Sequence, residues 1–436
     1  MSDIKIHITE FGPVKDADVA FAPMLLMTGN SNMGKSYVNY LFYFLMRSIT
    51  RDMFVQIVEK KFEKMKQSDA KLVFQLSEND LRRWLVDNVK PFMASFLGNE
   101  DMTCDVSFFL GMDKSIPDGL IKVEYNRKKS MEPDTDAPME TMTSTINVNG
   151  EISSYTAFVN DRYAERQQVA FSVSRYFQRV AFGRFFLKSV ILPPARGSYV
   201  GESYTAKEMI ATQAELYKAF LTDYVFALHA SIFNTGRTTD SQFFLSRMKT
   251  LIKGELATKD NKQYLVMNNG REIPLTAAAS SIKELSPFLF YLKNWSQHSL
   301  SFCIEEPEAH LHPTMQKDIA DLLAACINKG MCFQMTTHSD YFLQRVNQLI
   351  LLGRLRDKEP SAYEKFRKSH GLNLRFYLNE KDVACYYFHE DDENNVKIDK
   401  LEIGEEGLPL NSFFSIVRDF TNFEDDLNIA LYPEKY

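Results

Sequence analysis

The first fifty residues alternate between extended and buried patterns. Residues 4–9 place isoleucines on one face of a strand, and Phe11-Gly12-Pro13 supplies a turn before a second extended segment at 17–21. The apolar run 24–27 predicts a short buried strand, and residues 37–46 predict a buried helix. We therefore expect a hairpin, a buried strand, a loop and a buried helix, in that order.

The middle of the chain changes periodicity several times. Apolar residues recur at helical spacing from residue 54 to 62, and a period of two runs through much of 104–150. A second helical stretch, 163–187, leads into an apolar strand at 190–192, and most of 205–253 favours helix. Residues 263–275 indicate a hairpin, because Asn268-Asn269-Gly270 is a turn signal between two extended runs.

The last third predicts strands that end in polar residues. An apolar strand at 300–304 is followed by a helix that begins at Pro313 and ends by Gly330. A further strand is expected at 332–336. Two period-two runs, 383–388 and 396–403, indicate a hairpin whose acidic turn is solvated.

The loop between the first buried strand and helix carries recognisable chemistry. It reads Gly29-Asn30-Ser31-Asn32-Met33-Gly34-Lys35-Ser36, and Tyr37 follows it in the helix. Glycines let the backbone fold closely around an anion, and the N-terminus of a helix favours negative charge. Lys35 would add a charge for the phosphates and Ser36 a hydroxyl for Mg²⁺. This loop is a P-loop, and we expect residues 29–37 to bind the nucleotide.

A second cluster follows the strand at 300–304. It reads Glu305-Glu306-Pro307-Glu308-Ala309-His310-Leu311-His312-Pro313, and it places two carboxylates at the carboxyl end of a buried strand, where ligands of an open α/β sheet lie. Because side chains alternate along a strand, one carboxylate can help to hold Mg²⁺ while the other orients or deprotonates water. The acidic start of a helix is the simpler interpretation for Glu308.

Three histidines, His310, His312 and His338, lie in or near these segments. His338 follows the strand at 332–336 and could contact the terminal phosphate, although a histidine at such a position is more often a packed residue with a structural role. Its position one strand after the acidic pair favours the functional role. His310 and His312 with Glu308 resemble part of a zinc site, but such a site needs further ligands.

Several of these segments resemble the ABC-type ATPase heads of the RecF, SMC and OLD group, most closely the short AAA-type ATPases of bacterial phage-defence operons. The resemblance covers residues 1 to about 345 and rests on six motifs in the family's order. They are residues 4–18, the P-loop, Ile191-Leu192-Pro193-Pro194-Ala195-Arg196, Ala279-Ser280-Ser281-Ile282-Lys283-Glu284-Leu285, the Glu-Glu-Pro-Glu-Ala-His-Leu-His-Pro run, and Thr336-Thr337-His338-Ser339.

The resemblance assigns a role to individual residues. It implies that Glu305 is the Walker B acid, which holds Mg²⁺ with Ser36, that Glu306 is the catalytic base, and that His338 is the switch histidine. Ser280 matches the signature serine, which reaches the ATP of a second subunit in such heads. The chain departs from the pattern at Ser281, where glycine is usual, and Arg196 lies near the position of a Q-loop.

The predicted fold class is α/β, an ABC-ATPase-like P-loop NTPase head with a mixed sheet and a helical and β-rich insertion. We expect the ATPase core in 1–50 and 295–360, and the insertion in 51–185. A strand, a helical lobe and the signature region are expected in 186–294, and an α/β extension in 361–436.

The composition of the chain bears on which partners it can bind and in which compartment it works. The chain has 51 Lys and Arg against 57 Asp and Glu, so its net charge of −6 gives no general attraction for nucleic acid. The alternative is a local basic patch such as Arg127-Lys128-Lys129, which we expect at a turn of the insertion. Five scattered cysteines suit reduced thiols, and no run approaches the roughly 20 apolar residues of a membrane span. We expect a cytoplasmic protein that does not use a membrane.

The leading functional hypothesis is an ATPase that uses ATP and Mg²⁺, dimerises or forms a higher homo-oligomer, and works with a separate nuclease or toxin in anti-phage defence. The segment after His338 is too short for the Toprim nuclease domain of OLD proteins, which favours a separate effector. One rival is a RecF-like, DNA-binding ATPase of DNA repair. Another is a nucleotide-gated scaffold with little hydrolysis, which Ser281 in the signature suggests.

Overall fold

A computed structural model describes most of the 436-residue chain. The described residues are 4–65, 69–112, 119–131, 140–158, 161–200, 215–229, 239–260, 262–295, 299–391, 393, 395–409 and 421–429.

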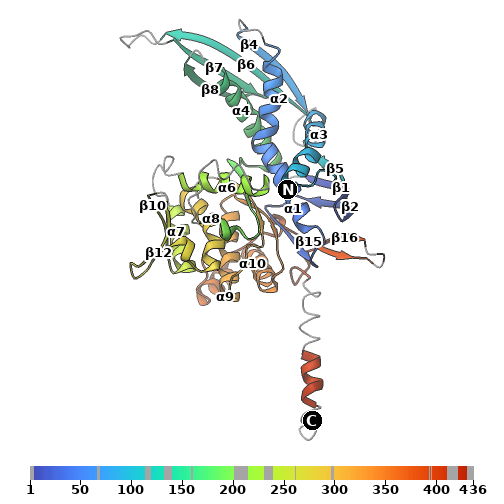
Figure 1. Ribbon diagram of the computed structural model, residues 1–436, viewed down its shortest axis with the longest axis vertical. Helices are drawn as coiled ribbons and strands as arrows, with labels where there is room; N and C mark the ends of the chain where they lie inside the picture. Colours follow the sequence, from blue (N-terminus) through green and yellow to red (C-terminus); the bar gives the residue numbers. More distant parts are fainter. Residues whose placement is uncertain are drawn as a thin grey trace.

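The central feature is a large mixed sheet, to which the described part of the chain contributes nine strands (Figure 1). In spatial order they are β5 (Cys104–Phe109), β1 (Lys5–Phe11), β2 (Val14–Ala20), β16 (Val396–Leu401), β15 (Val383–Glu390), β3 (Met24–Gly29), β14 (Cys332–Thr336), β13 (Leu300–Glu305) and β9 (Lys188–Leu192). The run from β15 to β9 is parallel, whereas the pairs β1/β2, β1/β5 and β15/β16 are antiparallel. This arrangement confirms the predicted α/β class with a mixed sheet.

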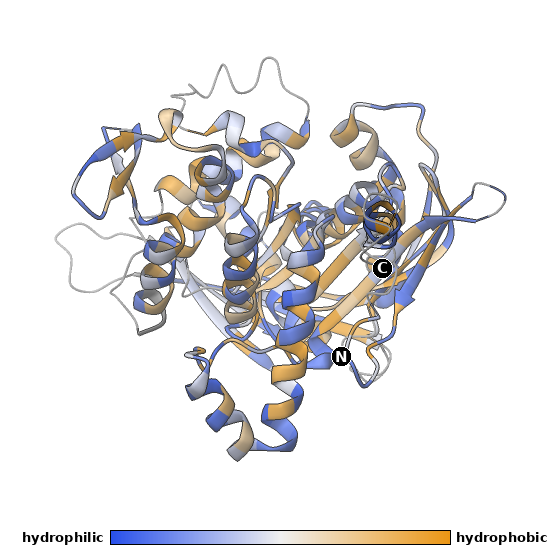
Figure 2. Cartoon of the chain, turned by 90° about the horizontal axis from the view of Figure 1, so that it is seen from below, coloured by the Kyte–Doolittle hydropathy of each residue, from blue (hydrophilic) through white to orange (hydrophobic). Residues whose placement is uncertain are grey.

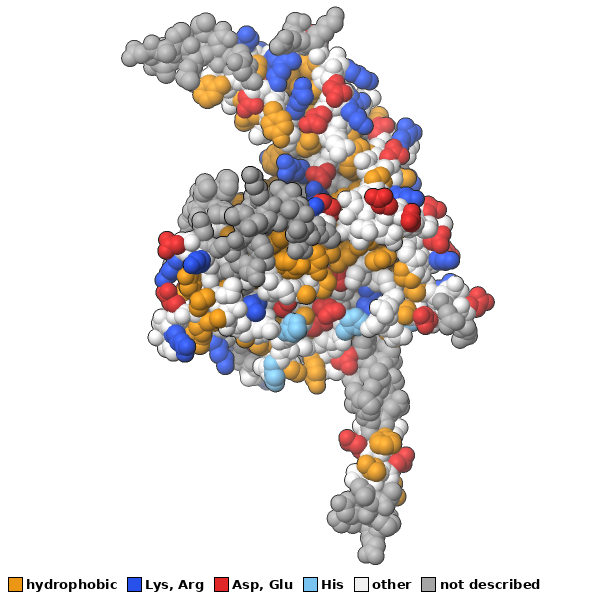
Figure 3. All heavy atoms as spheres, viewed as in Figure 1, with side chains coloured by type: hydrophobic (Ala, Val, Ile, Leu, Met, Phe, Trp, Pro, Cys, Tyr) orange, Lys and Arg blue, Asp and Glu red, His pale blue; other side chains and the backbone are white. Residues whose placement is uncertain are grey.

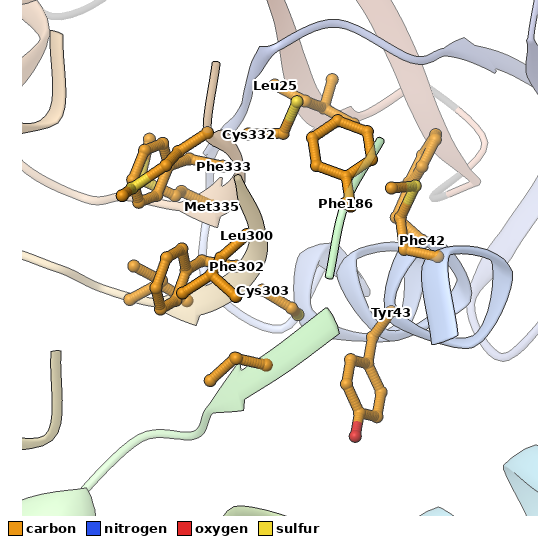
Figure 4. Close-up of a cluster of buried hydrophobic side chains, with 14 of the residues drawn as sticks. Leu25, Phe42, Tyr43, Phe186, Leu300, Phe302, Cys303, Cys332, Phe333 and Met335 are labelled. Carbon is orange, nitrogen blue, oxygen red and sulfur yellow. The ribbon is translucent and has the colours of Figure 1, made fainter. Parts of the chain in front are cut away.

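Helix α1 (Lys35–Arg47) packs on the parallel part of the sheet. Its residues from Val38 to Met46 are all buried, because this helix contacts β9, β13 and β14 on one side and other helices on the other. Figure 4 shows Phe42 and Tyr43 of α1 beside the apolar side chains of these strands. The rings of Phe302 and Phe333 stack with centroids 5.3 Å apart, which fastens β13 to β14.

Further helices surround this core, so that hydrophobic strands lie inside and more hydrophilic helical surfaces lie outside (Figure 2). These helices are α6 (Glu215–His229), α7 (Thr239–Ile252), α8 (Ser280–Trp295), α9 (Pro313–Ile327), α10 (Asp340–Lys358) and α11 (Pro360–Ser369). A small sheet of β10 (Gly254–Lys259), β11 (Lys262–Met267) and β12 (Glu272–Pro274) precedes α8. Short 3₁₀ turns lie at η3 (Arg196–Tyr199), η5 (Leu275–Ala277) and η6 (Glu380–Asp382).

A second sheet forms an arm that extends from the body (Figure 1). Its described strands are β4 (Lys71–Ser77), β6 (Leu120–Met131), β7 (Glu140–Val148) and β8 (Glu151–Phe158), accompanied by α2 (Met53–Phe62), α3 (Glu78–Leu97) and α4 (Arg162–Phe182). A π-helical segment, η1 (Ser48–Asp52), joins α1 to α2. The arm therefore grows directly out of the helix that follows the P-loop.

Three features differ from the sequence-based expectations. β5 falls within the predicted insertion but pairs with β1 in the main sheet. The run Arg127 to Lys129 lies inside strand β6, paired with β7, and not at a turn. β15 of the predicted C-terminal hairpin is a buried interior strand beside β3. Residues 205–214 and 230–238 of the predicted helical stretch lie outside the described residues, and α6 and α7 account for the rest.

Candidate nucleotide-binding site

The P-loop follows β3 and ends at the start of α1, as its sequence predicts. Gly29 has φ of +116°, and a Cβ at this position would lie 2.1 Å from the carbonyl oxygen of Phe388 in β15. The same oxygen accepts a hydrogen bond from Asn30 N at 3.1 Å. Only glycine permits this close approach, so the neighbouring strand β15 fixes where the loop begins.

The remaining loop residues divide between exposed and packed positions. Asn30, Ser31 and Asn32 are exposed, whereas Met33 is buried. Gly34 has φ of +78° and caps α1. The ring of Tyr37 packs under the turn at Gly12 of the N-terminal hairpin. The backbone N–H groups of such a glycine-containing loop can bind an anion.

The ammonium group of Lys35 lies inside the loop. Lys35 Nζ donates to the carbonyl oxygens of Gly29, at 3.1 Å, and of Asn30. Burial lowers the pKa of Lys35, and the negative charges of Glu305 and Glu306 oppose this shift. The ammonium group of Lys35 therefore interacts electrostatically with the carboxylates of Glu305 and Glu306.

Ser36 and Glu305 meet directly, although they are far apart in the sequence. Ser36 Oγ donates to Glu305 Oε2 at 2.7 Å, as does Thr336 Oγ1, also at 2.7 Å. Asn39 Nδ2 donates to Glu305 Oε1 at 2.8 Å. Burial raises the pKa of Glu305, and these three hydrogen bonds oppose the shift. A hydroxyl and a carboxylate oxygen side by side are the hard oxygen ligands that Mg²⁺ takes, so this pair fits the ion.

Glu306 lies beyond the end of β13 in an unusual backbone conformation. Its φ is +46°, and its backbone N–H donates to the carbonyl oxygen of Thr336 at 3.2 Å. The carboxylate is half-buried and raises the pKa of both Lys35 and His338. A left-handed conformation in a non-glycine residue costs about 1–3 kcal/mol and is typical of functional sites.

His338 stands at the carboxyl end of β14, the strand next to β13. Its side chain is exposed, and its backbone N–H donates to Glu308 Oε1 at 3.0 Å. Neighbouring protein atoms nevertheless desolvate part of the imidazole. This partial desolvation, and then the nearby charge of Lys35, lower the pKa of His338, and Glu306 opposes the shift. Lys35, Glu306 and His338 are therefore close enough to influence one another, as the sequence predicts.

Ser280 is placed differently from the other predicted residues. It is exposed at the first residue of α8. The hydrogen bonds and ion pairs of the described residues do not join it to the P-loop of its own chain. The structure thus brings together Lys35, Ser36, Glu305, Glu306 and His338 and leaves Ser280 on the surface.

Arg196 is a central residue to which the sequence assigned no role. It is only 2% exposed, and its guanidinium donates to the carbonyl oxygens of Pro193 (3.1 Å), Glu284 (2.9 Å) and Glu305 (2.8 Å). Burial lowers the pKa of Arg196, and the carboxylate of Glu284, 3.6 Å away, opposes the shift. Arg196 thus joins helix α8 to the turn that carries Glu305 and Glu306.

Glu308 corrects one expectation. It does not start a helix, because α9 begins at Pro313; it is buried, and its Oε1 accepts from Thr337 Oγ1 at 2.6 Å as well as from His338 N. Burial raises the pKa of Glu308, and the bond from Thr337 opposes the shift. Glu308 therefore positions His338. The only signal for this role in the sequence is its place in the acidic run.

The two histidines that follow the acidic pair, His310 and His312, have structural positions. His312 Nδ1 accepts from Thr314 N at 3.3 Å and so caps α9, while His310 is exposed with φ of +60°. Within the described residues, no group of three or more His, Cys, Asp or Glu side chains is arranged to hold a metal ion. No helix of the described chain has the length and apolarity needed to cross a bilayer.

The P-loop between β3 and α1, with the acidic end of β13 beside it, is the arrangement of an α/β P-loop NTPase fold. Residues 205–343, which include Ser280, Glu305, Glu306 and His338, match the family model described as an AAA ATPase domain. None of the curated proteins matches the chain.

Three solved structures with related shapes are SMC head domains. The SMC head bound to the C-terminal winged-helix domain of ScpA has a TM-score of 0.38 at 11% identity and covers 92% of this chain and 97% of that one. The SMC head domain from Thermotoga maritima has a TM-score of 0.33 at 10% identity, with coverage of 92% and 98%. The head with an extended coiled coil bound to the C-terminal domain of ScpA, derived from Pyrococcus furiosus, has a TM-score of 0.39 at 11% identity, with coverage of 97% and 100%.

Proposed function

We propose that this protein binds Mg-ATP at the P-loop and hydrolyses it. The observation that carries the proposal is the contact of Ser36 Oγ with Glu305 Oε2 at 2.7 Å, which joins the P-loop helix to the acidic strand end. A hydroxyl that follows the P-loop lysine and a buried carboxylate on the adjacent part of the sheet form the donor pair for the metal of such NTPases.

Each residue contributes a separate part of the reaction. The loop N–H groups and Lys35 bind the phosphates, and Ser36 and Glu305 would hold Mg²⁺. The ion neutralises charge on the leaving diphosphate when it is bound. Glu306 accepts the proton of the attacking water, and neutral His338 orients the terminal phosphate. Arg196 and Glu308 hold these two residues in place.

We further propose that two copies close head to tail around ATP, with Ser280 of each copy completing the other's site. Its exposed position at the start of α8 supports this proposal, because a helix N-terminus on the surface can face a phosphate on a second copy. By resemblance to defence ATPases, the hydrolysis cycle would control a separate effector, a nuclease or toxin, in the cytoplasm during anti-phage defence. Among the described residues drawn in Figure 3, basic and acidic side chains are interspersed, which does not favour a continuous basic surface for nucleic acid there.

A steady-state ATPase assay of Glu306→Gln tests the catalytic proposal. Loss of a general base is expected to reduce kcat roughly 10²- to 10⁴-fold, with the affinity for a fluorescent ATP analogue retained. The exposed residue Glu100 offers a matched control, since Glu100→Gln should hydrolyse ATP at the wild-type rate. Turnover of Glu306→Gln at the wild-type rate would show that Glu306 is not the base.

A further inference from the structure

We propose that a cavity at the far end of α1 binds a planar aromatic molecule that carries an anionic group. The cavity has a volume of about 1190 Å³ and lies between the last turns of α1, segment η1, helices α3 and α6, and strand β9. Arg47 closes α1 at this cavity, twelve residues after Lys35, which is about 18 Å along the helix axis. This site is therefore separate from the nucleotide-binding site, and the proposal does not depend on ATP hydrolysis.

Aromatic rings line much of the cavity, and several of them are stacked in pairs. Phe44 and Trp84 lie nearly parallel at 5°, and Phe226 and Trp295 stack with centroids 4.5 Å apart. Phe92 and Phe96 form a third pair with centroids 5.0 Å apart. All six rings line the cavity. Flat aromatic walls favour a flat ligand, because offset stacking of rings adds roughly 0.5–1.5 kcal/mol per pair beyond the area buried.

The charges around the cavity favour an anion. Arg47 pairs with Asp52, and Lys188 pairs with Asp223, each at 2.7 Å. Lys218 likewise pairs with Glu215 at 2.7 Å. Arg51, a residue of the π-helical segment, also lines the cavity, and its guanidinium has no partner among the described residues. Among the described lining residues, this leaves one positive charge without a neutralising partner, on an exposed side chain.

An unpartnered hydroxyl in the wall points independently to a ligand. Ser189 is 5% exposed and lines the cavity, and its Oγ has no hydrogen-bond partner among the described residues. Leaving a buried hydroxyl unsatisfied costs roughly 1–3 kcal/mol. A polar group of a bound molecule would satisfy Ser189 Oγ beside the ion pair of Lys188 and Asp223.

The volume also fits a small organic molecule. Ligand pockets in proteins usually measure about 300–1,000 Å³ and combine apolar walls with a few polar groups. At about 1190 Å³ this cavity is somewhat larger than that range, has the same kind of lining, and so has room for two fused or linked rings with an acidic substituent. Segment η1 at its edge supports the assignment, because π-helical turns often mark functional sites.

The experiment uses the full chain and the probe 8-anilinonaphthalene-1-sulfonate, which is aromatic and anionic. Trp84 and Trp295 are the chain's two tryptophans, and both line the cavity, so energy transfer from tryptophan to the probe reports binding there. We expect saturable transfer with a stoichiometry of one, unchanged in Lys35→Ala. Transfer that does not saturate, or that indicates several equivalent sites, would overturn the proposal.

Two variants separate the cavity from other apolar surface. Arg51→Glu should lower the affinity for the probe about fivefold, the equivalent of roughly 1 kcal/mol. Arg83→Glu, on an exposed face of α3 outside the cavity, should leave that affinity unchanged. Ala219→Trp on α6 should fill the cavity and abolish saturable binding, as judged by enhancement of the probe's own fluorescence. Equal affinity in wild type, Arg51→Glu and Ala219→Trp would overturn the proposal, and since Arg51 is exposed its variant should fold normally.

Discussion

At the scale of single residues, Arg196 connects the two halves of the site. Three of its hydrogen bonds go to carbonyl oxygens in different segments, and its partner Glu284 is buried. Removing one member of a buried ion pair costs roughly 3–5 kcal/mol, because the other charge is left uncompensated. We expect Arg196→Met to lower the free energy of unfolding by about this amount in a denaturant titration. The exposed Arg271→Met should change it by less than about 0.5 kcal/mol, and a similar small effect at Arg196 would contradict this role.

The protonation of His338 predicts a pH dependence. Partial desolvation of the imidazole and the Lys35 ammonium hold the pKa of His338 below 6.5, so His338 is neutral at pH 7. If neutral His338 orients the terminal phosphate, kcat/KM should be constant from neutral pH upwards and fall as pH drops through the lowered pKa, below 6.5. The sign for stability is the same, because the unfolded chain binds this proton more readily. His338→Gln should lack this acid limb in a pH–rate profile; an unchanged limb would assign it to another group.

Single residues also show what the sequence could and could not predict. The P-loop and the acidic pair could be recognised because their chemistry is written in consecutive residues. Arg196 and Glu308 could not, since their roles depend on what surrounds them. Arg196 reaches Glu284 and Glu305, and Glu308 reaches Thr337 on the next strand; none of these contacts follows from local spacing.

At the scale of elements, the P-loop depends on the strand beside it. The left-handed φ of Gly29 and the short distance from its Cβ position to Phe388 O leave no space for a side chain. We expect Gly29→Ala to displace the loop from β15 and to abolish binding of a fluorescent ATP analogue. Gly98→Ala is the matched control: its φ is +67°, nothing lies within 4 Å of the Cβ position, and only about 1–2 kcal/mol of backbone strain is expected, with ATP binding intact. Binding by Gly29→Ala at wild-type affinity would show that β15 does not set the loop.

The helices and strands themselves were largely predictable from the sequence, whereas the pairing of strands within the sheet was not. The alternating isoleucines of β1, the extended segment of β2 and the apolar runs of β3, β13 and β14 correctly predicted these strands, because hydrophobic patterning is a local property. The same patterns predicted β15 and β16 as a hairpin. They did not indicate that β15 lies beside β3, since strand order depends on pairing between segments hundreds of residues apart. The pairing of β5 with β1 in the main sheet could not be predicted for the same reason, since the sequence on both sides of β5 belongs to the arm.

At the scale of the whole molecule, the site exists because parallel strands end at one edge. β3, β14 and β13 are consecutive in the sheet, and each is followed at its carboxyl end by predicted site residues. This order brings Ser36, Glu305 and His338 to one place although they come from three segments. The N-terminus of α8 is held by Arg196 but faces outward, so the site of one chain contains every predicted group except the signature serine.

The exposed position of Ser280 leads to a prediction about ATP-dependent dimerisation. If Ser280 of one copy contacts the ATP of another, Ser280→Arg should block closure by steric overlap while each P-loop still binds ATP. In the Glu306→Gln background, where bound ATP would not turn over, analytical ultracentrifugation should show an ATP-dependent dimer that the added Ser280→Arg change abolishes. Thr276→Arg, at an exposed position four residues earlier in η5, should leave the dimer intact. A Ser280→Arg protein that dimerises with ATP and hydrolyses it at the wild-type rate would mean that each chain completes its own site.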